Sequence, residues 1–311
     1  MKVSIQTKLL GTYLLLVFIA IVGLSGAYYL ITRQDKRRES RQRVQIAFDI
    51  MLNDFVDRRN AYLTRFREFL KANSTIGEIG SMYEQGEKIL SEPNLLNAYI
   101  SKVATVMKDF GRLIEADKFV LYATDKRLLV AYQRHGDQDA VGGYVLSGTG
   151  KDTYLPLDNL TSTAMYSIWM GKTAVPDTPL PAGIVAHYER DLPDTASTEI
   201  FSEGPKIGIK ITTPVTYLEK TTGVLVCEIV FTQNLIQRYA SLSKTDINLF
   251  AGKQLSLGTL SAQTELNEEA LKQSAACEDL WNKVTTAEIA SVTFNISAIL
   301  LLIWETPVIP L

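Results

Sequence analysis

An uncharged stretch near the start of the chain constrains where the rest of the protein can fold. Residues 9–31 (LLGTYLLLVFIAIVGLSGAYYLI) contain no Asp, Glu, Lys or Arg. As a helix rising ~1.5 Å per residue they extend about 35 Å, enough to cross the ~30 Å hydrocarbon core of a bilayer with some tilt. Tyrosines near both ends favour the headgroup layer. We predict a single transmembrane helix over residues 9–31, preceded by a cytoplasmic N-terminus, residues 1–8.

A cleaved signal peptide is the alternative reading of this stretch. The apolar core of a signal peptide usually has ~7–15 residues and ends at a small-x-small cleavage site. Gly23, Ser25 and Ala27 form a weak version of such a site, but the apolar residues 28–31 continue past it. An uncleaved anchor fits the length better.

The charges around the span bear on its orientation. Lys2 and Lys8 precede the span. The basic residues that follow it closely are Arg33, Lys36, Arg37, Arg38, Arg41 and Arg43. The positive-inside rule, taken alone, would place the body of the protein in the cytoplasm. Asp35 and Glu39 partly offset this excess, and a long following domain can override the bias. We expect the body on the opposite side, because of the architecture described below.

The composition is that of a folded protein. Of 311 residues, 46% are hydrophobic and 21% are charged, which is enough to bury a core, and the chain has room for one large or two modest domains. A net charge of −2 and a pI near 5.9 give no electrostatic reason to expect nucleic acid as a partner. Cys227 and Cys277 can form one bridge in an oxidising compartment, but the apolar surroundings of Cys227 favour a buried free thiol.

A long helix is predicted to continue out of the membrane over residues 33–71, a segment without Gly or Pro. Its apolar residues recur at steps of three, four and seven, which places them on one face of a helix. They are Val44, Phe48, Met51, Phe55, Tyr62, Phe66 and Phe69. Either a domain of the same chain or a second copy of the helix must cover this stripe. The second case predicts a homodimer through residues 36–71, and both stay open.

Beyond this helix the sequence alternates between helical and strand patterns. A loop over residues 73–80 precedes helices over 81–90 and 94–116, with Pro93 suited to the first turn of the second. A hairpin follows, with strands at 119–123 and 128–132.

A glycine-rich loop is predicted next, leading into an irregular region that extends to Pro181. Its glycines are Gly136, Gly142, Gly143, Gly148 and Gly150. Such a long irregular connection is typical of a binding loop or lid. The remaining predicted elements are antiparallel strands over 184–189, 206–217 and 223–231, a helix over 232–242 capped by Thr232, strands over 246–250 and 254–260, a helix over 267–285 and a strand from 290.

Four segments carry a resemblance to a known family. They are Phe119-Val-Leu-Tyr-Ala-Thr-Asp, Ile211-Thr-Thr-Pro-Val, Gly223-Val-Leu-Val-Cys-Glu-Ile and Thr245-Asp-Ile-Asn-Leu-Phe-Ala-Gly-Lys-Gln-Leu-Ser-Leu-Gly-Thr-Leu. With the order of elements, they resemble the PAS-like, Cache-type extracytoplasmic sensor domains of bacterial chemoreceptors, sensor histidine kinases and membrane diguanylate cyclases. The likeness covers about residues 1–260. It implies an α+β fold in which the transmembrane helix continues into a long helix packed on a PAS-like antiparallel sheet.

The resemblance also implies a domain plan and a location. Residues 33–243 correspond to a Cache-like sensor module with its long N-terminal helix, and residues 244–311 to a partial second module or a C-terminal apolar segment. The body would lie on the periplasmic or extracellular side of a bacterial inner membrane, and the output domain is absent from this chain. The uncharged run 289–304 is short for a span. It permits a second crossing, a buried strand or helix, or the end of a truncated or frame-shifted sensor.

The sequence lacks the residue patterns of catalytic and metal sites. Gly150-Lys and Gly171-Lys-Thr have no glycine where a phosphate-binding loop needs its first one. His135 and His187 are the only histidines, and neither has a second histidine or a cysteine at ligand spacing. No Gly-x-Ser-x-Gly elbow is present. We expect no enzymatic activity, no metal and no cofactor.

A small-molecule sensor needs a concave pocket with a few polar groups that orient the ligand. The resemblance places this pocket between the concave face of the sheet and the loop that covers it. The candidate residues are Tyr122, Tyr132, Arg134, Tyr144, Tyr166, Trp169, His187, Tyr188, Glu189 and Lys210. Arg134 or Lys210 can pair with a carboxylate, and the aromatic rings supply walls. Strand alternation turns roughly half of the candidates away from the pocket.

The sequence therefore predicts a membrane-anchored extracytoplasmic sensor that binds a small-molecule ligand for signal transduction, as in chemotaxis. Ligand would shift the balance between two packings of the long helix. The alternative is a membrane-anchored structural or interaction protein that recruits a partner through its helical apolar stripe, without a ligand.

Overall fold

The computed structural model describes residues 5–84, 93–136, 138–146, 152–158, 164, 167–168, 170, 172, 178–251, 254–260, 264–265 and 300–302. Its elements in chain order are α1 (Ile5–Ala72), α2 (Thr75–Glu84), α4 (Pro93–Leu113), β1 (Lys118–Ala123), β2 (Leu128–His135), β3 (Gln138–Leu146), β4 (Asp152–Pro156), β5 (Ser197–Glu203), β6 (Lys206–Tyr217), β7 (Lys220–Val230), α6 (Gln233–Ser243), β8 (Asn248–Ala251), β9 (Gln254–Gly258) and β10 (Leu300–Leu302).

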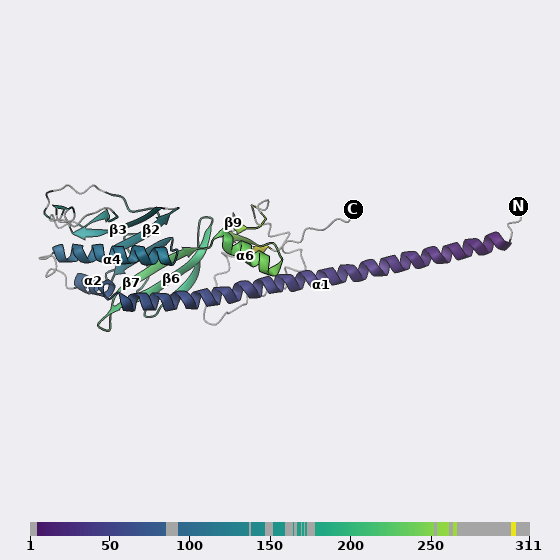
Figure 1. Ribbon diagram of the computed structural model, residues 1–311, viewed down its shortest axis with the longest axis horizontal. Coiled ribbons are helices and arrows are strands. Elements are labelled where there is room, and N and C mark those ends of the chain that lie inside the picture. Colours follow the sequence, from purple (N-terminus) through teal and green to yellow (C-terminus); the bar gives the residue numbers. More distant parts are fainter. Residues whose placement is uncertain are drawn as a thin grey trace.

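Helix α1 is one uninterrupted helix of 68 residues, or about 100 Å at ~1.5 Å per residue. Its segment Tyr13–Lys36 has a mean hydropathy of 2.4 and no buried residues. Among the described residues it is the one helix long and apolar enough to cross a membrane. The N-terminal half of α1 projects away from the rest of the molecule (Figure 1). The predicted continuation of the apolar run into a long helix over residues 33–71 is confirmed.

Seven strands form one antiparallel sheet in the order β4-β3-β2-β1-β7-β6-β5. The first hairpin therefore lies at the centre, beside the long β6–β7 hairpin. Helices α2 and α4 and the C-terminal half of α1 cover one face, which we call the helix face (Figure 1). A second sheet has the order β10-β8-β9. The predicted α+β class, with a long helix against a PAS-like antiparallel sheet, is confirmed.

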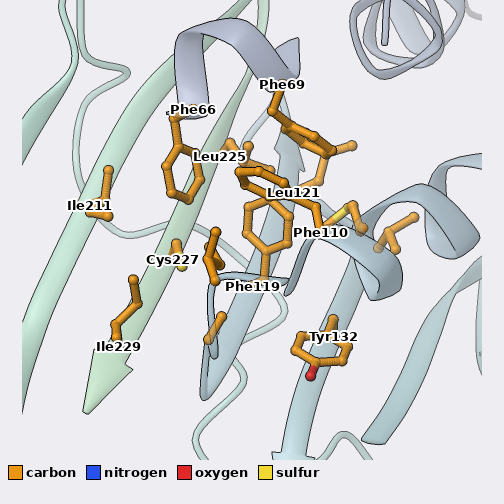
Figure 2. Close-up of a cluster of buried hydrophobic side chains, with 14 of the residues drawn as sticks. Phe66, Phe69, Phe110, Phe119, Leu121, Tyr132, Ile211, Leu225, Cys227 and Ile229 are labelled. Atoms are coloured by element: carbon orange, nitrogen blue, oxygen red, sulfur yellow. The ribbon is translucent and has the colours of Figure 1, made fainter. Parts of the chain in front are cut away.

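The core of the protein lies on the helix face. Alternation along the central strands sends every second side chain there. On β1, β6 and β7 these buried side chains include Phe119, Leu121, Ile211, Leu225, Cys227 and Ile229, and Figure 2 shows them beneath the phenylalanines of the helices.

Four phenylalanines fix the end of α1 to the sheet. The ring of Phe66 meets Phe110 of α4 and Phe119 of β1 edge to face, with centroids 5.3 and 5.6 Å apart. The ring of Phe69 stacks on Phe110 at 4.0 Å. Burial of each ring contributes about 1.5–3 kcal/mol, and such pairs add about 0.5–1.5 kcal/mol. A movement of α1 relative to the sheet must disturb this cluster.

The apolar stripe of α1 packs on the protein's own domain. Met51, Phe66 and Phe69 are buried in the core, and Phe55 stacks on Phe231 with centroids 5.2 Å apart. Of the two covers left open above, the intrachain one is observed. A homodimer through residues 36–71 stays a prediction.

The prediction for the segment after α1 is wrong in part. Residues 75–80, expected in a loop, form the first turns of α2, which ends at Glu84. Residues 85–90 of the predicted helix lie outside the described part of the chain. Helix α4 begins at Pro93, as predicted, and ends at Leu113.

Two glycines account for that error. A Cβ on Gly77 would lie 2.8 Å from the carbonyl oxygen of Thr216. A Cβ on Gly80 would lie 2.8 Å from the carbonyl carbon of Thr222 and closer still to its oxygen. The glycines allow α2 to approach the backbone of the β6–β7 hairpin, and this packing outweighs their poor helix propensity.

The predicted glycine-rich loop is also wrong in part. Gly142 and Gly143 lie within β3, which pairs with β2 and β4. A Cβ on Gly143 would lie 2.9 Å from the carbonyl oxygen of Leu129. Gly148 and Gly150 lie outside the described residues.

The structure replaces one predicted strand with another. Residues 184–189 form no strand and make a single isolated bridge, between Arg127 and His187. The edge strand β5, with the polar sequence STEIFSE, pairs with β6 instead. Its weak alternation explains why the sequence pattern did not reveal it.

The C-terminal part follows the sequence as far as it is described. Strands β8 and β9 confirm the two strands predicted after α6, and β10 pairs antiparallel with β8. Thr232 occupies the N-cap position of α6, but its side chain makes no capping hydrogen bond. The predicted helix 267–285, the strand from 290 and Cys277 lie outside the described residues, and the domain plan stays a prediction.

Candidate functional site

The face of the sheet opposite the helices is covered by an irregular segment. Residues 178–196, named the cover segment, contain no helix and no strand. Ile184 of this segment is buried against the sheet. The sheet side chains clustered with it are Val120, Tyr122, Leu128, Ala131, Tyr154, Val224 and Val226. We call this side of the sheet the covered face.

Backbone hydrogen bonds hold the cover segment to the β1–β2 hairpin at two places. The N–H of Leu128 donates to the carbonyl oxygen of Ala186 at 2.9 Å, and the N–H of Tyr188 donates to the carbonyl oxygen of Lys126 at 2.8 Å. The segment is therefore attached without a continuous ladder. Such an attachment opens at a lower free-energy cost than a paired strand.

A cavity of about 140 Å³ lies between the cover segment and the β1–β2 turn. It is lined by Tyr83, Arg127, Leu128, Tyr144, Ala186 and His187. The guanidinium of Arg127 lies over the ring of Tyr83, 5.7 Å from its centroid. The volume is below the ~300–1,000 Å³ of pockets for drug-sized ligands, so the cavity suits a small organic molecule.

Ionisable side chains form a row across the covered face. Directly opposite residues of paired antiparallel strands share a face. The register pairs Glu199 with Lys210, Lys210 with Glu228, and Glu228 with Lys118. The Nζ atoms of Lys210 and Lys118 lie 3.5 and 3.3 Å from the carboxylate of Glu228. At the outer end, Nη1 of Arg190 donates to both carboxylate oxygens of Glu199 at 3.0 Å. The charges alternate in sign, so each carboxylate has a cationic neighbour.

Lys118 is the most enclosed cation of the row, with a side chain 12% exposed. Its Nζ donates to Glu203 at 2.6 Å. Burial alone would lower the pKa of Lys118, but the carboxylates of Glu203 and Glu228 raise this pKa above its ordinary value. Gly183 of the cover segment has φ +76°, and a Cβ there would lie 2.5 Å from the same Nζ. The cover segment therefore rests directly on this ammonium group.

Gln133 continues the row on β2, opposite Lys118. Its Nε2 donates to the carbonyl oxygen of Ala182 at 3.0 Å. Its Oε1 is buried and has no hydrogen-bond partner among the described residues. A buried acceptor without a partner costs about 1–3 kcal/mol. A donor placed beside this oxygen would recover that free energy.

Tyrosines form the apolar part of the covered face. Tyr122 is 4% exposed, and its ring lies 5.5 Å from that of Tyr188 in the cover segment. Tyr144 and Tyr154 meet edge to face at 5.7 Å. Burial raises the pKa of Tyr122 well above its usual range and that of Tyr154 to about 12, so both hydroxyls are neutral near pH 7.

The structure divides the residues predicted for the site. On the covered face or in the cover segment lie Tyr122, Tyr144, His187, Tyr188, Glu189 and Lys210. Tyr132 and Arg134 point to the helix face, where the hydroxyl of Tyr132 donates to Asp139 at 2.8 Å and Nη2 of Arg134 lies 3.9 Å from Asp117. Tyr166 and Trp169 lie outside the described residues.

Sequence reasoning missed most of the polar residues of the site: Lys118, Gln133, Arg190, Glu199 and Glu228 of the row, and Tyr83 and Arg127 of the cavity lining. One signal was available for Glu228, because it is the single charge within the apolar strand 223–231. Glu228 follows Val224 and Val226 at every second position of the strand, so its side chain faces the cover segment as theirs do. A charge at such a position indicates a polar partner across the strand.

Two features of the described residues bear on metal and thiol chemistry. Among them, no group of three or more His, Cys, Asp or Glu side chains could hold a metal ion. Cys227 is buried on the helix face, and burial raises its pKa well above the ordinary value, which disfavours a reactive thiolate.

Comparison with known proteins yields distant structural likenesses. No protein-family model matches the chain, and no curated protein matches it. Among solved structures, it is similar to a domain of a putative sensory box/GGDEF family protein from Vibrio parahaemolyticus, with 11% identity over 70% of this chain and 82% of that one and a TM-score of 0.31. It is similar to the sensor domain of the V. cholerae histidine kinase DctB, with 11% identity over 72% and 75% and a TM-score of 0.31. It is also similar to the sensory domain of the Campylobacter jejuni chemoreceptor Tlp3, with 13% identity over 64% and 74% and a TM-score of 0.28.

Proposed function

We propose that this chain is a membrane-anchored sensor that binds a small organic molecule between the sheet and the cover segment. The observation that carries the proposal is the covered face, where tyrosines, a row of ionisable groups and a cavity are enclosed by chain without regular structure. A face that served only to bury apolar surface would need none of the charges, because enclosing ionisable groups costs free energy.

The ligand that fits the cavity best is small and polar. The cavity limits its size, Arg127 and His187 of its lining offer polar contacts, and Tyr83 and Tyr144 supply aromatic walls. The other candidate contacts, on the covered face or in the cover segment but outside the cavity lining, are Tyr122, Tyr188, Glu189 and Lys210. Tyr132 falls outside this site because it is buried on the helix face, and strand alternation turns Arg134 to the same side.

The anchor and the placement of the body are part of the proposal. Residues 9–31 hold the protein in the membrane as a single span, with residues 1–8 in the cytoplasm and the sensor module outside it. Because α1 is continuous from the span into the core, a ligand that favours one packing of the sheet against α1 changes the position of the span. The shift is limited by the difference in the ligand's affinity for the two packings.

The alternative, an interaction protein that uses the apolar stripe of α1, is less favoured because part of that stripe is covered within the same chain. Met51, Phe66 and Phe69 are buried within the same chain. We therefore do not propose it.

The experiment is a thermal-unfolding screen of the full chain in lipid nanodiscs against a metabolite library, followed by circular dichroism. Ligand at ~100 times its Kd adds about 2.7 kcal/mol, which corresponds to a rise in Tm of roughly 5–10 °C for a domain of this size. A saturable rise with one compound is expected.

Two exposed residues of the cover segment make a matched pair of variants. His187→Ala removes a side chain that lines the cavity and should weaken the response, whereas Val185→Ala, which lies outside the cavity lining, should leave it unchanged. A screen without any saturable shift, or an equal response in both variants, would contradict the proposed site.

A further inference from the structure

We infer that the protein has a second binding site, for a small monocarboxylate, where α1, α6 and the end of β7 meet. The site lies on the helix face, whereas the cover segment lies on the opposite face, and the two cavities share no lining residue. It is a cavity of about 260 Å³, larger than the cavity beside the cover segment. In Figure 1, α6 lies along α1 at this junction.

The walls of this junction cavity differ in polarity. One part is apolar and consists of Ile114, Ile209, Ile229 and Leu235. The other part carries Arg58 of α1 and Arg238 of α6. A ligand with a short hydrocarbon chain and an anionic head matches both parts.

One of the two arginines has no ion-pair partner among the described residues. Nε of Arg58 is paired with Asp54, which also accepts a hydrogen bond from the hydroxyl of Tyr239. Burial alone would raise the pKa of Asp54, but these hydrogen bonds lower it, so this carboxylate is ionised at neutral pH. Arg238 forms no ion pair with any described residue, and its electrostatic interaction with Asp54 acts over a longer distance than an ion pair. The Asp54 carboxylate is therefore taken up by Arg58, whereas the guanidinium of Arg238 is open to a ligand; Glu115, on the same lining, balances part of the charge.

The start of α6 adds a second attraction for an anion. Thr232 stands at the N-cap, but its side chain makes no capping hydrogen bond, and both Thr232 and Asn234 line the cavity. The first N–H groups of a helix and its dipole favour negative charge. The arginines and the start of α6 border the same cavity.

The charges of the lining and the position of the cavity narrow the choice of ligand. Glu115 also lines the cavity, so a second carboxylate on the ligand would meet repulsion, and a monoanion fits better than a dianion. Arg58 lies about 40 Å along α1 from the end of the apolar run at Ile31, at ~1.5 Å per residue. Lipid headgroups do not extend that far, so a soluble carboxylate is the occupant.

The test uses ligand-observed saturation-transfer NMR with the full chain in nanodiscs and butyrate as the probe. We expect a saturable signal with butyrate, a weaker one with succinate and none with n-butylamine. Arg238→Ala should weaken butyrate binding about tenfold or more. Arg67→Ala is the matched control, because it removes one exposed positive charge from α1 outside the cavity and should leave binding unchanged.

Each other outcome overturns the inference. No saturable butyrate signal, equal binding of n-butylamine, or equal loss in Arg67→Ala and Arg238→Ala would exclude the junction site. His187→Ala should retain butyrate binding, and this separates the junction site from the one beneath the cover segment. Circular dichroism of Arg238→Ala verifies folding, which should be retained because the side chain is exposed and not ion-paired.

Discussion

Gly80→Ala is expected to destabilise the protein although it improves helix propensity. Alanine in a helix interior is favoured over glycine by about 1 kcal/mol, so the local effect in α2 is stabilising. The new Cβ, however, would lie 2.8 Å from the carbonyl carbon of Thr222 and nearer to its oxygen. Because these are backbone atoms of β7, no rotamer change relieves the contact. Overpacking of this kind costs about 1–3 kcal/mol, and a backbone contact belongs at the upper end.

The two terms leave a net loss of about 2 kcal/mol. For a domain of this size, about 1 kcal/mol corresponds to a change in Tm of roughly 2–4 °C, so we expect Tm to fall by roughly 4–8 °C. The assay is thermal unfolding of the full chain in nanodiscs, followed by circular dichroism.

Gly26→Ala is the matched control for this helical glycine. A Cβ at Gly26 in α1 meets no atom within 4 Å, so no contact opposes the gain in helix propensity and the Tm of the domain should not fall. An unchanged or higher Tm for Gly80→Ala would refute the reasoning. It would mean that helix propensity decides and that the close approach of α2 to the β6–β7 hairpin is absent.

Three further predictions concern two charged residues and the orientation of the chain in the membrane. Burial alone would raise the pKa of Asp54, but its hydrogen bonds with Tyr239 and Arg58 lower this pKa below its ordinary value of about 4. The contribution of Asp54 to stability is therefore complete above about pH 4 and is lost as the pH falls through the folded-state pKa, so Asp54→Asn should flatten the acid limb of the plot of Tm against pH. Lys118→Met should lower Tm more than Arg190→Ala, because it strips the enclosed Glu228 of its nearer cation whereas Arg190 is exposed; equal losses in thermal unfolding would contradict this order. A reporter that is active only outside the cytoplasm, fused at about residue 150, should give a signal, and a signal from a cytoplasm-only reporter would overturn the proposed orientation.

Elements with a strong local pattern could be predicted from the sequence. Helix α1 follows from an uncharged run joined to a stripe of helical period, and β6 and β7 follow from long apolar runs separated by a short connection. In these cases the periodicity and the tertiary packing favour the same structure.

Elements whose structure depends on contacts with residues far away in the sequence could not be predicted. Gly77 and Gly143 read as loop signals, but each is needed where a backbone from another element comes close. Residues 184–189 have the apolar character of a strand, yet they lie over a face of the sheet and join no strand ladder. They make one isolated bridge only. In each case the deciding contact lies far away in sequence.

The candidate site was predictable in residue type more than in place. Tyr122 and Lys210 lie on the covered face, whereas Tyr132 lies on the helix face. The β-bulge after Leu121 and the pairing register decide which alternate residues of each strand face the cover segment. Glu228 completes the row of charges through pairing with Lys118, a contact across strands 110 positions apart that no local pattern contains.

The two proposed sites differ in how directly they reach the membrane. Helix α1 is held at its C-terminal end by Phe66 and Phe69 and, nearer the span, by Asp54 and Phe55 through α6 and β7. A ligand beneath the cover segment touches none of these and must act through β1 and β7. A ligand in the junction cavity touches Arg58 of α1 and Arg238 of α6 together, so it can change the attachment of α1 without deforming the sheet. If both sites bind, their ligands bias the same helix and must alter each other's affinity by the same factor.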